Sequence, residues 1–471
     1  MTSLSIKDGI DMNYTVIKAN EYIKVNLEKV NTKHRHRFHL MPEVGWMNDP
    51  NGFIYYQGYY HLFYQFHPYE AKWGPMHWGH ARSKNLIDWE HLPVALAPDL
   101  SHEDGCFSGG ATLFDDKLYL MYTSHYHQEF QRQEQSLAVS TDGIHFQKGY
   151  APVITINDLP KQASKVDFRD PNPVTIDGKH FILIGSSTQD KQGQILVYQT
   201  EDFKTYHFLN AILHPFFGEI AECPDLFELD GKHVLLFSAT NLKTENNRFK
   251  NVNSSLYAIG QFDVKTGSFH FEHVDEIDAG HHYYAPQTLS EQNKRVSVAW
   301  MEMWGKPYYT ALSNHAWVGA MTLPRVLSIQ NNRLIQTPIS LCDFTKTTQL
   351  LNAQSLSNTS KFFVLTGQIG TQTPSVIRIG TPTSYFELRL DAHMVTLDTS
   401  STQLFPLEAR SIEHHRNQIN FTLVMDNSSL ELFMEGVDKT ITTRVYFDEE
   451  RLDIEVKSHN YKNLTLKELN K

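Results

Sequence analysis

Cysteine is scarce in this chain, and its few copies argue against a fold held together by disulfides. Three cysteines occur among 471 residues, at Cys106, Cys223 and Cys342, without a paired spacing or a Cys-x-x-Cys motif. Disulfide-dependent secreted domains carry many cysteines at short, regular intervals. Three reduced thiols are the simpler account, and they predict a cytoplasmic protein.

Long apolar runs are missing as well. No stretch approaches the roughly 20 consecutive apolar residues that a membrane-spanning helix needs. The first 13 residues include Asp8 and Asp11 and no apolar core, so they do not resemble a signal peptide. The sequence therefore predicts no membrane partner.

Positive charge is in deficit. The chain has 42 Lys and Arg residues against 53 Asp and Glu residues, a formal net charge of −11. This balance argues against nucleic acid as a partner, although it leaves room for a small basic pocket. The oligomeric state is not predicted.

Metal-ligand spacing is also lacking. The 25 histidines, including His125, His127, His281 and His282, form no His-Glu-x-x-His motif and no Cys/His pattern. His34-Arg35-His36-Arg37 has no second ligand cluster, and we interpret it as a solvated basic patch. No metal and no other cofactor is predicted.

What the chain does contain is a repeat built from strands. Five times a turn with Gly, Asp or Asn leads into an apolar and aromatic strand, beginning at Gly58, Asp116, Asp177, Asp230 and Asn293. Strand-only units that recur roughly every 50 to 65 residues are typical of the blades of a β-propeller. We predict an all-β fold with a five-bladed β-propeller over residues 38–330.

The remaining segments differ from the repeat. Residues 1–37 form a polar N-terminal segment with a short helix predicted at Asn20–Val30. Residues 331–350 contain Asn331-Asn332 and are interpreted as a linker. From residue 351 to 471 short strands alternate apolar and polar residues, which predicts a β-sandwich.

Acidic residues recur at the start of three predicted blades. They are Asp49 in Asn48-Asp49-Pro50-Asn51, Asp170 in Arg169-Asp170-Pro171-Asn172, and Glu222 in Glu222-Cys223-Pro224-Asp225. The first strand of each blade lines the central channel of a propeller, so residues of equal phase meet there. We expect these three carboxylates to lie in one funnel.

Two carboxyl groups in a funnel suit the cleavage of a glycosidic bond, in which one gives a proton and the other stays ionised. Asp49, beside Asn48 and the N–H groups of a turn, is expected to remain an anion and to act as the nucleophile. Burial and like charge should raise the pKa of Glu222, which suits the acid/base. Asp170 follows Arg169, which should hold it ionised to stabilise the transition state.

Aromatic and amide residues lie near the same blade starts. Sugars present flat apolar faces and rings of hydroxyl groups, which such residues bind, so a small carbohydrate is the expected partner. The candidates on this ground are Trp46, Gln65, Trp73, Phe107, Tyr284 and Trp300.

The chain resembles the β-fructofuranosidases of glycoside hydrolase family 32, and among them the bacterial sucrose-6-phosphate hydrolase and sucrase group. The resemblance runs from about residue 33 to the C-terminus and is carried by several ordered motifs. These are Trp46-Met47-Asn48-Asp49-Pro50-Asn51-Gly52, Trp78-Gly79-His80-Ala81, Phe107-Ser108-Gly109, Phe168-Arg169-Asp170-Pro171, Glu222-Cys223-Pro224-Asp225, Tyr284-Ala285-Pro286-Gln287 and Leu323-Pro324-Arg325.

This resemblance implies a five-bladed propeller with a β-sandwich and hydrolysis with net retention of configuration. It implies that Asp49 is the nucleophile, Asp170 the transition-state stabiliser and Glu222 the acid/base. It further implies a set of fructose-binding residues, namely Asn48, Gln65, Trp73, Phe107, Ser108 and Arg169.

Some features leave alternatives open. Gly109-Gly110-Ala111 departs from the Gly-Ser-Ala of many relatives, and Ala81-Arg82-Ser83 from Ala-Thr-Ser, on the side of the leaving group. The same acids would serve a fructosyltransferase, and a non-catalytic carbohydrate-binding propeller is a third reading. Sucrose, its 6-phosphate and short fructo-oligosaccharides all remain candidate substrates. Arg82 and Lys72 are the candidate partners for a phosphate at the funnel mouth.

Overall fold

A computed structural model describes residues 14–101, 103–127, 132–350, 355–457 and 461–471. Strands dominate these residues, and the only α-helices among them are α1 (Val16–Asn26) and the short α2 (Tyr309–Leu312). In these ranges no helix combines the length and the apolar character needed to cross a membrane. The all-β prediction is confirmed.

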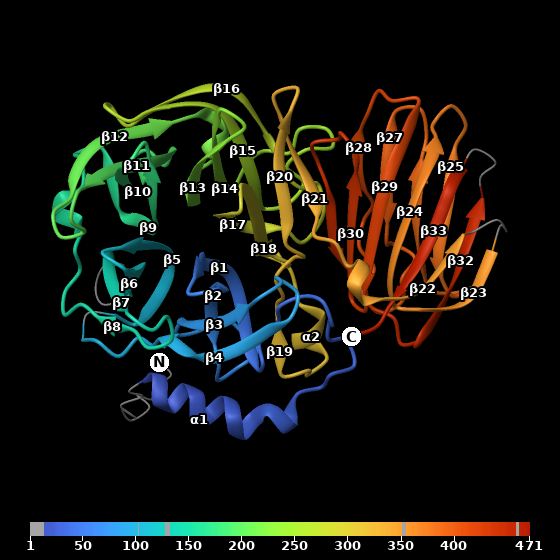
Figure 1. Ribbon diagram of the computed structural model, residues 1–471, viewed down its shortest axis with the longest axis horizontal. Helices are drawn as coiled ribbons and strands as arrows, with labels where there is room; N and C mark the ends of the chain where they lie inside the picture. Colours follow the sequence, from blue (N-terminus) through green and yellow to red (C-terminus); the bar gives the residue numbers. More distant parts are fainter. Residues whose placement is uncertain (1–13, 102, 128–131, 351–354, 458–460) are drawn as a thin grey trace, which may run out of the picture.

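The first part of the chain folds into five sheets arranged in a ring (Figure 1). The first sheet holds β1 (Gly45–Tyr56), β2 (Tyr59–His67), β3 (His77–Ser83), β4 (Trp89–Leu96) and the distant β19 (Trp317–Val318). The second holds β5 (Gly105–Phe114), β6 (Lys117–Tyr126), β7 (Arg132–Ser140) and β8 (Gln147–Lys148). The third holds β9 (Ala163–Ile176), β10 (Lys179–Thr188), β11 (Gly193–Thr200) and β12 (His207–Leu213). The fourth holds β13 (Ala221–Leu229), β14 (Lys232–Thr240), β15 (Asn253–Asp263) and β16 (Ser268–Glu276). The fifth holds β17 (Tyr284–Glu291), β18 (Lys294–Trp300), β20 (Arg325–Gln330) and β21 (Arg333–Pro338).

The ring is closed through the first strands of these sheets. Strands β1, β5, β9, β13 and β17 contact one another in that order, and β17 contacts β1. Between β18 and β20 the chain crosses to the first sheet, where β19 pairs parallel with β1 and Trp317 lies opposite Gly45. The predicted propeller-like domain is confirmed, and its first strands surround a common axis.

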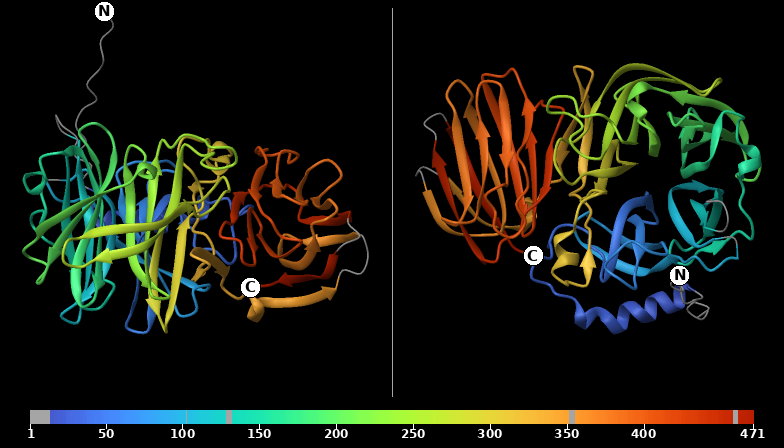
Figure 2. Two further views of the ribbon diagram at one scale, coloured as in Figure 1. Left: turned by 90° about the horizontal axis from the view of Figure 1, so that it is seen from above. Right: turned by 180° about the vertical axis from the view of Figure 1, so that it is seen from behind.

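The second part of the chain is a sandwich of two six-stranded sheets beside the ring (Figure 2). One sheet has the order β22 (Thr345–Leu350), β33 (Tyr461–Leu469), β24 (Phe362–Gly370), β29 (Gln418–Asp426), β30 (Ser429–Met434) and β31 (Ile441–Arg444). The other has the order β23 (Ser355–Ser360), β32 (Arg451–Lys457), β25 (Ser375–Gly380), β26 (Tyr385–Leu390), β27 (Met394–Asp398) and β28 (Arg410–Glu413). Apolar residues such as Phe363, Leu365, Ile377 and Leu423 alternate inward and are fully buried between the sheets. The sandwich prediction is confirmed.

Two local predictions need correction. Residues 331–350 are not a linker, because they contain β21 and β22; Asn331 and Asn332 form the tight turn of the β20–β21 hairpin, with φ of 51° and 57°. Asparagine tolerates this left-handed conformation, so the pair marks a hairpin turn rather than a loose segment. The N-terminal helix begins at Val16, earlier than predicted, where the Thr15 side chain accepts a hydrogen bond from the Lys18 N–H.

The segment from His34 to Arg37 lies against the sandwich, and of its four residues only Arg37 is exposed, so it is not the solvated patch that was predicted. His34 and His36 are 1% and 9% exposed. Ser428 donates its hydroxyl hydrogen to the His34 carbonyl, and Asp426 accepts the N–H of Arg37. The backbone of this segment therefore finds its partners in the second domain, which the sequence alone does not reveal.

The two parts are joined by a buried polar network centred on Arg325. Its guanidinium is fully buried, and it reaches Asp278 in the ring and Glu431 in the sandwich. It also donates to the hydroxyl groups of Thr440 and Thr442. A buried charge with partners in both domains fixes one orientation of the sandwich against the ring.

Candidate active site

In each of the five sheets of the ring, a bulge interrupts the first strand at the sequence motif that this strand carries. Pairing shifts register between Met47 and Pro50 in β1, Phe107 and Gly109 in β5, Arg169 and Asn172 in β9, Glu222 and Asp225 in β13, and Tyr284 and Gln287 in β17. A bulge adds an unpaired residue and turns a side chain out of the regular alternation. Asp170 and Cys223 adopt φ of 62° and 48° within these bulges. The local strain re-aims their groups toward the axis of the ring.

Asp49 and Asp170 meet at Cys223. The Ser108 hydroxyl donates to Asp49 Oδ2 at 2.8 Å, and Cys223 Sγ lies 3.7 Å from the same oxygen. The Cys223 N–H donates to Asp170 Oδ2 at 3.0 Å, and its Sγ lies 3.5 Å from that oxygen. Asp49 Oδ1 is buried without a hydrogen-bond partner. One oxygen of Asp49 is thus held in place, and the other has no hydrogen-bond partner.

Glu222 is held from two sides. Arg169 donates from Nε and Nη2 to Glu222 Oε1, at 3.1 and 2.7 Å. The Tyr284 hydroxyl donates to Glu222 Oε2. Arg169 is itself fixed by Asp167 Oδ1 at 3.1 Å. These contacts orient the longest of the three acidic side chains.

Burial has the largest effect on the pKa values of the two aspartates. Burial raises the pKa of Asp49 to about 6, with a further contribution from Glu222 and opposition from the Ser108 hydrogen bond. Burial also raises the pKa of Asp170 to about 7, opposed by Arg169 and reinforced by Glu222 and Asp49. The sequence predicted that neighbouring groups keep both aspartates ionised. The direction of the shift is the reverse, because burial outweighs the neighbouring N–H and guanidinium groups.

The predicted residues surround one cavity of about 110 Å³. Nine of them line it, namely Asn48, Asp49, Gln65, Trp73, Phe107, Ser108, Arg169, Asp170 and Glu222. Trp304 also lines it and was not predicted. It follows the last strand of the repeat in Met303-Trp304-Gly305, and that apolar context is the only hint in the sequence.

Three predicted residues lie outside the lining of this cavity. Tyr284 reaches it only through the contact with Glu222, and Trp46 and Trp300 are buried behind Trp304. The Trp304 ring centre is 5.9 Å from that of Trp46 and 4.9 Å from that of Trp300. The two buried rings therefore support the indole that faces the cavity.

The structure does not place Arg82 at the mouth of this cavity. Its guanidinium donates to Glu90 at 2.7 Å and lies over the ring of Tyr59. Arg82 in β3 pairs with His61 in β2, near the end of the sheet that is far from Trp46 and Asp49. Lys72 is exposed and forms an ion pair with Glu70. Arg82 was therefore a wrong candidate for a phosphate, because sequence proximity to the Trp78-Gly79-His80 motif does not show which end of a strand a residue occupies.

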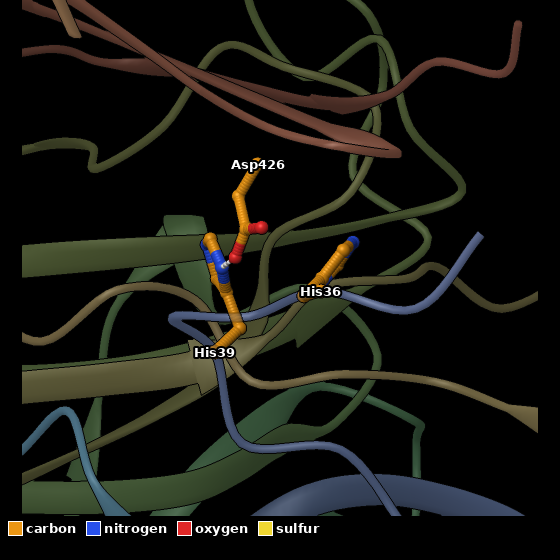
Figure 3. A group of neighbouring side chains, drawn as sticks. All are labelled: His36, His39 and Asp426. Atoms are coloured by element: carbon orange, nitrogen blue, oxygen red, sulfur yellow. Dashed lines mark hydrogen bonds and ion pairs between the residues drawn. The ribbon is translucent and has the colours of Figure 1, made fainter. Parts of the chain in front are cut away.

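One buried group, made of His36, His39 and Asp426, has the residue types of a metal site (Figure 3). His39 is already satisfied at both ring nitrogens, by Asp426 at 2.6 Å and by Glu431 at 2.8 Å. Although burial alone would lower it, these two carboxylates raise the pKa of His39 to about 9. The imidazolium is thus a buried cation that pairs the two domains, and its nitrogens are not free for a metal.

Five sheets around an axis, with three convergent carboxyl groups in a tryptophan-lined cavity, define a glycoside hydrolase. Residues 39–338 match the family described as "Glycosyl hydrolases family 32 N-terminal domain". Residues 378–470 match the family described as "Glycosyl hydrolases family 32 C terminal". The chain belongs to glycosyl hydrolase family 32.

Individual relatives span nearly the whole chain. A sucrose-6-phosphate hydrolase of Escherichia coli is 33% identical over 456 residues, covering 91% of this chain and 92% of that protein. A raffinose invertase of Escherichia coli is 35% identical, covering 87% of this chain and 89% of that protein. A solved GH32 beta-fructofuranosidase of Bombyx mori is 32% identical with a TM-score of 0.86, covering 97% of this chain and 98% of that one.

Proposed function

We propose that the protein is a retaining β-fructofuranosidase that removes the terminal fructose of sucrose-type substrates by double displacement. The observation that carries the proposal is the meeting of Asp49, Asp170 and Glu222 in one small cavity. A retaining glycosidase needs one carboxylate that attacks and one carboxyl group that transfers a proton. The relatives named sucrose-6-phosphate hydrolase and raffinose invertase support sucrose-type substrates.

In the first step Asp49 attacks the anomeric carbon with Oδ1, the oxygen that has no hydrogen-bond partner. Ser108 holds the other oxygen, so the attacking one is aimed. Glu222 gives a proton to the glycosidic oxygen as the bond to the leaving group breaks. The products of this step are the free leaving sugar and a fructosyl ester of Asp49.

In the second step the Glu222 carboxylate takes a proton from water, and the water oxygen attacks the same anomeric carbon. The ester bond to Asp49 breaks, and fructose leaves with its original configuration. Asp170 holds hydroxyl groups of the fructose and stabilises the positive charge on its ring in both steps. Arg169 and Tyr284 keep Glu222 in reach of both oxygens.

We further propose that the enzyme acts in the cytoplasm. All three cysteines are free thiols, and Cys106 and Cys223 are buried in the ring. This pattern is typical of proteins kept in a reducing compartment.

The proposal is tested with purified protein and sucrose. Release of glucose and fructose is expected, with kcat reduced by roughly three orders of magnitude or more in Asp49→Asn and Glu222→Gln. Asp177→Asn is the matched control, because Asp177 is exposed at the far end of the strand that carries Asp170. Glu222→Gln should keep relatively more activity on a fructoside whose leaving group needs no proton. Equal losses on both substrates would remove Glu222 from the acid role.

A further inference from the structure

A second cavity lies directly beside the catalytic one. Its volume is about 610 Å³, and Trp73 and Phe107 line both cavities. Its other walls come mainly from residues 98–101, 103 and 104, between β4 and β5, and from the end of β6. We call it the side cavity. In the proposed function a terminal fructose binds between the three acids, and the side cavity is the neighbouring space that the shared aromatic side chains connect to it.

The shared wall continues as a row of flat rings. The Trp73 side chain is 42% exposed, and its ring centre is 6.0 Å from that of Phe107. Phe107 stacks on His125 with a centre distance of 4.0 Å and an angle of 8°. His125 lines only the side cavity, so the row leads from one cavity into the other. Flat aromatic faces of this kind bind the apolar faces of sugar rings.

Polar groups in the side cavity are acceptors rather than cations. The carboxyl groups of Asp99 and Asp104 belong to its lining, together with the phenol of Tyr126. Glu103 is already occupied, because it accepts hydrogen bonds from Tyr122 and Ser124. Asp99 Oδ1 accepts a hydrogen bond from Lys148, and Asp104 Oδ2 accepts one from the His127 N–H. The second oxygen of each carboxylate is therefore the acceptor that a sugar hydroxyl group can use.

The side cavity offers no free cation among the described residues: its lining has no lysine or arginine, and the nearby Lys148 is paired with carboxylates. Lys148, beneath the side cavity, is tied to Glu103, to Asp99 Oδ1 at 2.9 Å and to the Ala97 carbonyl at 2.6 Å. Burial lowers the pKa of His125 to about 4, so its ring is neutral in ordinary buffers. Among the described residues that line the side cavity there is no lysine and no arginine. A phosphate dianion would face carboxylates here without a free cation.

We propose that the side cavity binds a further neutral sugar unit carried by the leaving group. The preferred substrates are then uncharged oligosaccharides that end in a β-fructofuranosyl unit, in preference to phosphorylated disaccharides. This proposal rests on the proposed function, because it names the substrate class of the same site.

Matched substrates test it. Raffinose and sucrose 6-phosphate extend the glucose unit of sucrose from the same oxygen, one with a neutral galactosyl unit and the other with a phosphate. The expected order of kcat/KM is raffinose, then sucrose, then sucrose 6-phosphate, with the difference between raffinose and sucrose in KM. A higher kcat/KM for sucrose 6-phosphate than for sucrose would overturn the proposal.

Asp104→Asn keeps the shape of the side chain and removes its charge. We expect KM for raffinose to rise about fivefold, as a charge-assisted hydrogen bond is weakened. KM for sucrose 6-phosphate should fall, and sucrose should change less than about twofold. Asp115→Asn is the control, because Asp115 is exposed in the turn at the opposite end of the same sheet. Equal changes for all three substrates would show that Asp104 acts on folding or on the catalytic cavity, and would overturn its role.

Tyr126→Ala is a second variant, and it should raise KM for raffinose while leaving kcat for sucrose unchanged. Binding to Glu222→Gln protein separates the two proposals. If raffinose binds this variant several-fold more tightly than sucrose does, the side cavity is supported even if turnover fails. If sucrose and raffinose bind equally, the side cavity is overturned while hydrolysis of sucrose by the unaltered protein still supports the proposed function.

Discussion

Replacing Asp49 with asparagine should stabilise the fold while it removes the activity. Asp49 is 8% exposed, and burial raises its pKa from 3.8 to about 6. One pKa unit corresponds to about 1.4 kcal/mol, so ionised Asp49 costs the folded state about 3 kcal/mol. Asparagine has nearly the same volume, can still accept the Ser108 hydrogen bond and carries no charge. The charge on Asp49 therefore lowers the free energy of unfolding, and the uncharged variant removes this destabilisation.

The sign of this effect depends on pH. The folded-state pKa of Asp49 lies above its unfolded value, so its cost is fully present above pH 6 and is lost as the pH falls below about 4. Thermal unfolding at pH 8, 6 and 4 measures it. We expect Asp49→Asn to raise Tm by several degrees at pH 8, at roughly 2–4 °C per kcal/mol for domains of 150–250 residues, and by almost nothing at pH 4.

Asp177→Asn, in an exposed turn of the same ring, should leave Tm unchanged at every pH. A variant of Asp49 that is less stable than the parent at pH 8 would refute the reasoning. So would a gain of equal size at pH 8 and pH 4, because the effect would then not come from ionisation.

Other predictions follow from single contacts. Ser108→Ala should move the acidic limb of the pH profile of kcat/KM to higher pH, because the hydrogen bond from Ser108 lowers the pKa of Asp49. An unchanged limb would show that this hydrogen bond does not set the ionisation of Asp49. Tyr284→Phe should reduce kcat about tenfold with little change in KM, because Glu222 loses one of its two supports; a change in KM alone would contradict this. Arg325→Met leaves the buried carboxylate of Asp278 without its cation and Glu431 with His39 alone. Denaturant unfolding should show a loss of about 3–5 kcal/mol, and a neutral effect would mean that the network does not join the domains.

Much of the site could be predicted because its residues occupy the same position in successive copies of a repeated unit. Asp49, Asp170 and Glu222 each precede a strand of the same pattern, and equal phase around an axis means proximity in space. The register of a strand is likewise set by its own alternation, which is why the sandwich was predictable. These features are local in sequence.

What could not be predicted depends on contacts between distant segments. Burial of His36 follows from the docking of Ser428 and Asp426, which lie in the other domain. The raised pKa of Asp49 follows from enclosure by several sheets, whereas its sequence neighbours suggested the reverse. Trp304 reaches the cavity from an irregular segment after the fifth repeated hairpin. Positions in this segment do not correspond to positions in the repeat, so the repeat could not predict it. The side cavity, formed between two sheets, has no sequence signature of its own.

The configuration of the first fructose released is the most direct test of double displacement by Asp49 and Glu222. NMR spectra recorded within the first minutes of sucrose hydrolysis, before the anomers equilibrate, report it. The proposed mechanism predicts that β-fructofuranose appears first and that the α-anomer grows in only as the sugar equilibrates. If the α-anomer appears first, water attacks the sugar directly and Asp49 is not the nucleophile.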